Sequence, residues 1–185
     1  MSTALRPALL SALLALAASG ASAQGGAAWV EQVGVTLGPA TADALGPGAG
    51  QTERLLALIP ADLAPSANAI VVDQSGTGNR VDVEQTGEGN LLALIQGGSD
   101  LVATVVQSGT GNRLLAAIDG SGNELESLQD GQNNTYDLQL SGSGTFHRVL
   151  QVGEDLTLNQ VVAPGMRPAS VEQRGSGFAI QIDRR

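Results

Sequence analysis

"QSGTGNRVDVEQTGEGN", the stretch from Gln74 to Asn90, contains the phrase Gln-x-Gly-x-Gly-Asn twice, with five residues between the two copies. The period continues far beyond this stretch. Glycine occupies nine of the ten positions counted in steps of eleven from Gly76, and Pro164 is the exception; the glycines are Gly76, Gly87, Gly98, Gly109, Gly120, Gly131, Gly142, Gly153 and Gly175. A fixed period without insertions, from Asn68 to the C-terminus, is typical of a solenoid.

Each of the eleven repeat units divides into a seven-residue strand and a four-residue turn. Side chains alternate between the two sides of a strand. The unit that begins at Asn79 has Asn79, Val81, Val83 and Gln85 on one side, and Arg80, Asp82 and Glu84 on the other. We therefore expect an apolar inner face with an amide at each end and a polar outer face.

The same alternation assigns inner residues in the other units. They include Ile70, Val72, Leu92, Leu94, Ala103, Val105, Leu114, Ala116, Tyr136, Leu138, Ala169, Val171, Ile180 and Ile182, with weaker pairs at Leu125 with Ser127 and His147 with Val149. The last turn position carries glycine, Asn or Asp in every turn except the one that contains Met166. These three residue types tolerate a left-handed backbone, so the turn "APGM" is expected to differ.

The Gln and Asn residues recur most regularly between units that are two apart in the sequence, a separation of 22 residues. One series is Gln85, Gln107, Gln129, Gln151 and Gln173; the other is Asn68, Asn90, Asn112 and Asn134. Two strands and two turns for each rung predict an all-β, flat two-sheet solenoid of about five rungs, with rungs about 4.8 Å apart. Stacked amides would satisfy each other in a dry interior, as in cross-β structures.

The repeat is less regular elsewhere. Ile118, Leu140 and Val162 replace Gln in one series, and Leu101, Thr145 and Leu156 replace Asn. One outer face is predicted to be charged, and the other carries an apolar stripe of Leu91, Ala93, Ile95, Leu115 and Ala117. This stripe could bundle fibrils, meet a partner or be covered by the segment before the repeats.

The N-terminus is predicted to be a signal peptide, residues 1–23. Arg6 precedes a short apolar run, and the small-x-small motif Ala21-Ser22-Ala23 predicts cleavage after Ala23. Residues 24–67 are rich in Ala, Gly and Pro, and we interpret this leader as mostly flexible. Within it, "QTERLLALI" could form a short helix over the first rung, and "WVEQVG" resembles a repeat but lies out of phase.

The composition argues against several classes of function. The formal net charge of -9 argues against nucleic-acid binding, and the absence of cysteine excludes disulfides and thiolate metal sites. His147 is predicted to be structural, and Asp82 and Glu126 lie on an outer strand with Thr104 between them. Acidic residues are too sporadic for a calcium β-roll. We expect no enzyme activity, cofactor or small-molecule substrate.

The Gln-x-Gly-x-Gly-Asn turn, the Asn-x5-Gln strand and the 22-residue double unit together resemble the curlin repeat over residues 68–185. Curlins are the secreted subunits of curli, the extracellular amyloid fibres of bacteria. The resemblance implies a β-solenoid that polymerises with itself and other curlins at the cell surface. It also implies export through the curli secretion machinery of the outer membrane, with roles in adhesion and biofilm matrix.

Two stretches are more similar to the minor, nucleating curlin than to the major one: "QGGSDLVATVVQSGTGNR" (Gln96 to Arg113) and "EQRGSGFAIQIDRR" at the end. The out-of-frame leader and the interrupted amide series also favour a minor subunit. Two alternatives stay open: a major curlin, or a monomeric β-solenoid adhesin, which would need caps at both ends. The last strand, "FAIQIDR", carries no evident cap.

Overall fold

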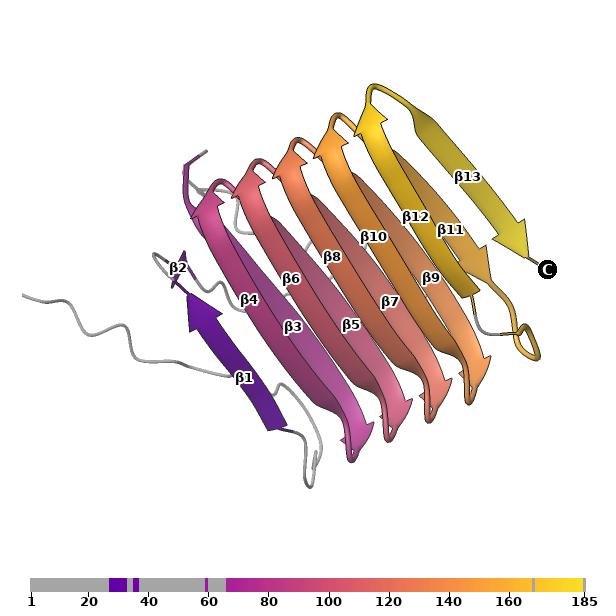
Figure 1. The fold of residues 1–185 in the computed structure, drawn as a ribbon. Coiled ribbons are helices and arrows are strands. Elements are labelled where there is room, and N and C mark those ends of the chain that lie inside the picture. The colour runs from indigo at the N-terminus through magenta and orange to yellow at the C-terminus, as the bar shows by residue number, and fades with distance from the viewer. Residues whose placement is uncertain (1–26, 33–34, 37–58, 60–65, 168, 185) are drawn as a thin grey trace, which may run out of the picture.

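The structure, a computed structural model, describes residues 27–32, 35–36, 59, 66–167 and 169–184. Within these ranges the chain is all-β, a flat coil of two facing layers (Figure 1). Its strands are β1 (Ala27–Gln32), β2 (Val35–Thr36), β3 (Asn68–Thr77), β4 (Arg80–Glu88), β5 (Leu91–Ser99), β6 (Val102–Thr110), β7 (Arg113–Ser121), β8 (Glu124–Gln132), β9 (Thr135–Ser143), β10 (Phe146–Glu154), β11 (Thr157–Val162), β12 (Ala169–Ser176) and β13 (Ala179–Arg184).

From β3 onward, alternate strands belong to alternate sheets. Sheet A has the order β1-β4-β6-β8-β10-β12, and sheet B has the order β13-β11-β9-β7-β5-β3-β2. All neighbours are parallel, and from β3 onward the register shifts by one rung of 22 residues, as in Gln85↔Gln107 and Gln107↔Gln129. The predicted two-sheet solenoid of about five rungs is therefore confirmed.

The regular strands are longer than predicted. We expected a seven-residue strand from Asn79, whereas β4 runs for nine residues from Arg80 to Glu88. The difference arises because the first turn residues still pair with the next rung, as Gly87 does with Gly109. The parallel backbone ladder thus continues into the corner. From β4 to β11, the residue we placed first in each strand belongs to the corner instead, whereas Asn68 does begin β3.

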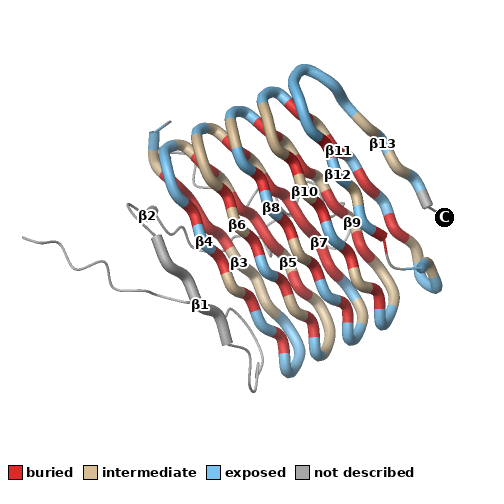
Figure 2. Tube along the Cα trace, viewed as in Figure 1, coloured by how far each residue is buried: buried red, intermediate tan, exposed pale blue. Residues whose placement is uncertain are grey.

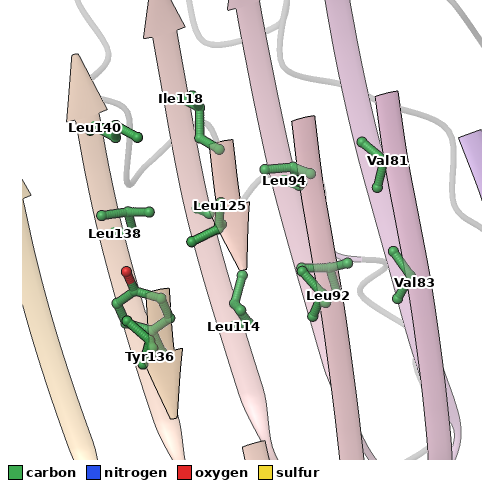
Figure 3. Close-up of a cluster of buried hydrophobic side chains, with 14 of the residues drawn as sticks. Val81, Val83, Leu92, Leu94, Leu114, Ile118, Leu125, Tyr136, Leu138 and Leu140 are labelled. Carbon is green, nitrogen blue, oxygen red and sulfur yellow. The ribbon is translucent and has the colours of Figure 1, made fainter. Parts of the chain in front are cut away.

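The core lies between the two sheets. Along most strands, buried residues alternate with more exposed ones (Figure 2). Figure 3 shows valines, leucines and Tyr136 from both sheets filling this space. The inner residues predicted from alternation are buried or packed against this core, including Leu125 and Val149. Val72, Val171, Ile180 and Ile182 are only partly buried, and all four lie in the outermost repeat rungs.

The turns confirm the predicted left-handed positions. Asp100, Asn133 and Asp155 have φ values of 55°, 53° and 54°, and the glycines at the equivalent positions are also positive. The exception predicted at Met166 is present, because the positive φ in that turn belongs to Gly165. The preceding strand, β11, is correspondingly short, with six residues.

The leader contains structure that the sequence did not reveal. The stretch "WVEQVG", which lies out of phase with the repeat, contributes to β1, and β1 pairs in parallel with β4 in the register Gln32↔Gln85. Val35 of β2 pairs with Asn68 of β3. The interpretation of residues 24–67 as mostly flexible is therefore wrong for these two strands. The eleven-residue frame could not find them because the long connection between β2 and β3 resets the phase.

The remaining predictions for the N-terminal part fall outside the described residues. These are the signal peptide, its cleavage after Ala23, and the helix in "QTERLLALI" up to residue 58. Ile59, the last residue of that stretch, is described and lies in a bend.

Candidate functional site

The five glutamines of the predicted series form a continuous ladder inside sheet A. In each of the first four, the side-chain amide N–H donates to the Oε1 of the glutamine one rung further along the chain. The Nε2–Oε1 distances are 2.6 Å for Gln85–Gln107, 2.7 Å for Gln107–Gln129, 2.8 Å for Gln129–Gln151 and 2.7 Å for Gln151–Gln173. All five side chains are buried. Burying an amide without a hydrogen-bond partner costs free energy. The stability of each rung therefore depends on which residue occupies the same position in the neighbouring rungs.

The second hydrogen of each Nε2 has a partner that the sequence did not predict. Gln107 Nε2 donates to the backbone carbonyl of Leu91, the first residue of β5 in sheet B, at 3.1 Å. Gln85, Gln129, Gln151 and Gln173 make the equivalent bonds to carbonyls 16 residues earlier at 3.0–3.2 Å. The glutamine ladder therefore joins consecutive rungs and also ties sheet A to sheet B at their shared corner.

The asparagines stack, and Asn134 Nδ2 donates to Asn112 Oδ1 at 3.0 Å as we expected, but the other bonds of the series go to backbone groups. Asn90 Oδ1 accepts the backbone N–H of Asn112 at 3.1 Å. Its Nδ2 donates to the carbonyl of Thr86 in its own turn and to the carbonyl of Gly109 in the next rung, at 2.9 and 3.1 Å. A single buried asparagine thus satisfies three backbone groups that a turn would otherwise leave unpaired.

Asn79 and Asn123 do the same at the opposite corner, which the 22-residue series had not included. This geometry explains why Asn can be replaced in alternate rungs. Leu101, Thr145 and Leu156 each still donate a backbone N–H to the asparagine in the rung before them. The replacement removes the bonds toward the following rung and the bond that an Asn side chain would donate within its own turn.

The corner glycines permit the close stacking of rungs. At Gly109, where φ is +105°, a Cβ would lie 2.0 Å from the carbonyl oxygen of Gly131. Backbone atoms cannot yield by that amount, so no other residue fits there without moving a rung. The other eight predicted glycines also have positive φ. Gly142 faces Pro164, the one position where the glycine series is broken, with its Cβ position 2.8 Å from the Cα of Pro164.

Sheet B has a shorter amide ladder at the equivalent position. Gln74 Nε2 donates to Gln96 Oε1 at 2.7 Å. The next residue in the stack is Ile118, which offers no acceptor, and Gln96 Nε2 is buried without a hydrogen-bond partner. Leu140 and Val162 continue the stack as buried apolar residues.

The interior of the later rungs is more polar. His147 is fully buried in sheet A, in register between Leu125 and Ala169. In sheet B, the Tyr136 hydroxyl donates to Gln160 Oε1 at 3.3 Å, and burial raises the pKa of Tyr136. The buried position predicted for His147 is confirmed, and its stacking neighbours are apolar.

The outer surface of sheet A holds the acid pair considered for catalysis. Asp82, Thr104 and Glu126 stack in register, so Thr104 separates the two carboxylates. Glu126 forms an ion pair with Arg148 at 3.4 Å, and Asp82 forms one with Arg80 at 2.8 Å. In the part of the chain that the structure describes, no three His, Cys, Asp or Glu residues are grouped closely enough to hold a metal ion.

The same described ranges contain no helix that could cross a lipid bilayer. Comparisons with protein-family models, curated proteins and solved structures gave no match to this chain.

Proposed function

We propose that this protein is a secreted structural subunit of curli-type extracellular amyloid fibres. The observation that carries the proposal is the buried glutamine ladder, which is unbroken from Gln85 to Gln173. Parallel, in-register strands with stacked identical amides are the repeating unit of cross-β fibres. The resemblance of residues 68–185 to the curlin repeat supports the same function.

Assembly would use the edge formed by β12 and β13. Among the described strands, each of these two has a neighbour on one side only. Gln173 is the last glutamine of the ladder, Phe178 is 40% exposed, and Ile180 and Ile182 are incompletely buried. A rung from another copy would extend both sheets and cover these side chains, as edge strands readily do.

The proposed role is that of the minor, nucleating subunit. Gln occupies only two of the five stacked positions in sheet B, from Gln74 to Val162, which suits a less regular subunit than the bulk of a fibre. Closing the first rungs costs chain entropy before stacking gives any return. A chain with preformed rungs would offer a template that removes this delay for a more regular curlin.

The proposal includes export and location. The predicted signal peptide, residues 1–23, would direct the chain out of the cytoplasm, and the curli secretion machinery of the outer membrane would deliver it to the cell surface. There it would support adhesion and biofilm matrix. The proposal assigns the protein no catalytic activity, cofactor, small-molecule substrate or nucleic acid.

The first test is fibre formation by residues 24–185 at neutral pH. We expect thioflavin-positive fibres whose diffraction shows the reflection at about 4.7–4.8 Å of stacked strands. The pairing of β1 and β2 with the N-terminal edge favours one alternative, a capped monomeric adhesin. A folded chain that stays monomeric over the same incubation would support that alternative and contradict the fibre proposal.

The second test separates a nucleator from a major curlin. A few per cent of this chain is added to a regular major curlin, with and without deletion of residues 173–185. The intact chain is expected to shorten the lag before fibre formation, and the deletion is expected to lose that effect. Abundant fibres from this chain alone, with no effect on the lag of the other curlin, would identify a bulk subunit instead.

A further inference from the structure

The outer faces of the two sheets differ in burial. In β4, β6, β8 and β10 of sheet A, every outward-facing residue is at least partly exposed. On sheet B, by contrast, five outward-facing residues are buried: Ala69 at 0%, Val71 at 3%, Ala93 at 0%, Leu115 at 2% and Ala117 at 1% relative exposure. An outer strand face can reach such values only where another part of the chain lies on it.

Among the described residues outside the sheets, Ile59 packs against this face. Ala93, Leu115 and Ala117 form an apolar cluster separate from the main core, and Ile59 and Ile95 pack against it. We call Ala93, Ile95, Leu115 and Ala117 the lateral patch. It spans the neighbouring strands β5 and β7, and it ends at β9, where the outward residues Asp137 and Gln139 are polar.

The connection that carries Ile59 is long enough to reach the patch. Residues 37–67 join β2 to β3, both in sheet B. The patch begins one strand from β3 and ends two strands from it, a distance of roughly 10 Å at ordinary strand spacing. A chain segment of this length can extend several times further, at roughly 3.3 Å per residue. The same connection can therefore cross the patch and return.

We propose that the lateral patch is a docking surface for the chain's own segment around Ile59, and that this contact prevents two copies from associating through the outer face of sheet B. A tethered segment has an effective concentration in the millimolar range, which a second copy at ordinary concentrations does not match. The occupied patch leaves the strand edges, rather than this face, available for contact between copies. The inference does not depend on fibre formation, since it concerns the single folded chain.

Cross-linking tests which chain occupies the patch. The protein has no cysteine, so the double variant Ile59→Cys/Ile95→Cys introduces the only two thiols. The full-length variant is made in ¹⁵N-labelled and unlabelled forms, mixed, and treated with a short bis-maleimide. We expect a link between residues 59 and 95 in peptides of a single isotope, at a yield independent of protein concentration.

The matched control is Ile59→Cys/Val106→Cys, because Val106 faces outward from the same region of the opposite sheet. It should give little intramolecular link. Mixed-isotope links between residues 59 and 95 would mean that a second copy occupies the patch. A yield no higher than that of the control would mean that Ile59 does not dock there. Either result overturns the proposal.

A second variant tests the consequence. Ile59→Asp places a charge against the patch and should expose it, giving a several-fold rise in the fluorescence of a hydrophobic dye and concentration-dependent association in sedimentation. Adding Leu115→Lys should reverse both effects, and Val106→Asp alone should cause neither. Circular dichroism checks that the variants keep their strands. An Ile59→Asp chain that keeps its fold, binds no more dye and stays monomeric would contradict the blocking role.

Discussion

Sheet A and sheet B fill the same interior position in two different ways. At the last inward position before the corner, sheet A places Gln in five consecutive rungs, and every amide is hydrogen-bonded to the next. Sheet B begins with Gln74 and Gln96 and then changes to aliphatic residues. The two stacks have the same backbone geometry, so the difference lies in the side chains alone.

The difference shows that a buried Gln needs another hydrogen-bonding side chain at the same position of the next rung, whereas a buried aliphatic residue needs no particular neighbour there. Gln96 Nε2, at the point where the sheet B ladder stops, is buried and unpartnered. Ile118 in the following rung needs no partner, because its burial is favourable by itself. Sheet A therefore gains a specific register from every rung, and sheet B gains mainly hydrophobic burial.

The largest effect is expected when the register of sheet A is broken. Insertion of one alanine after Val105, in the middle of β6, moves Gln107 out of the ladder and reverses the faces of the residues that follow in that strand. Loss of the cooperative unfolding transition, measured by circular dichroism, is the expected result. The control is the same insertion after Gly165, in the irregular turn between β11 and β12, where no other atoms crowd the backbone. An equal loss of cooperative unfolding at both sites would contradict the prediction that the regular register of β6 matters more than the irregular turn at Gly165.

A smaller but still large effect is expected at the corner that follows sheet A. Gly109→Ala would place a Cβ 2.0 Å from the Gly131 carbonyl oxygen. We expect destabilisation of about 3 kcal/mol or more in urea unfolding, since the backbone of a rung must shift. Gly144→Ala, at the opposite corner, has open space and pays only for its positive φ, roughly 1–2 kcal/mol. Similar losses would mean that backbone conformation, and not rung spacing, selects these glycines.

A pH-dependent effect of modest size is expected on the outer face of sheet B. Burial raises the pKa of Asp137, and the nearby Arg113 partly offsets this shift. The folded chain thus disfavours the charged form of Asp137. The contribution of Asp137 to the free energy of unfolding is therefore greatest below its pKa in the unfolded chain, and it is lost as pH rises through its pKa in the folded chain. Asp137→Asn should remove this fall and raise the unfolding midpoint at neutral pH. Asp82→Asn, on sheet A, should give no such gain because Asp82 pairs with Arg80.

The repeat frame was sufficient to predict most of the fold. Position in the eleven-residue unit identified the inner residues, the left-handed turn positions at Asp100, Asn133 and Asp155, and the glutamine ladder. These features are local consequences of strand alternation and turn geometry, which a sequence carries directly.

Other features depend on contacts that the frame does not encode. The bonds of Asn90 to three backbone groups follow from the path of the turn, and the sequence pattern showed only that asparagines stack. The pairing of β1 with β4 joins segments separated by a long connection, so no period links them. The packing of Ile59 on sheet B was one of several alternatives for the apolar stripe, and sequence alone could not choose among them.

The central claim is that the unbroken amide ladder of sheet A stabilises the solenoid and the interrupted one of sheet B does not. Comparing Gln129→Leu with Gln96→Leu tests this claim. Leucine at 129 leaves Gln107 without an acceptor and Gln151 without a donor in a dry corner. Leucine at 96 removes a buried, unpartnered N–H and costs the part-buried Gln74 one bond. In urea unfolding we expect Gln129→Leu to lower the free energy of unfolding by about 1–3 kcal/mol and Gln96→Leu to change it by less than about 1 kcal/mol. Equal losses in the two variants, or a larger loss at Gln96, would contradict the account.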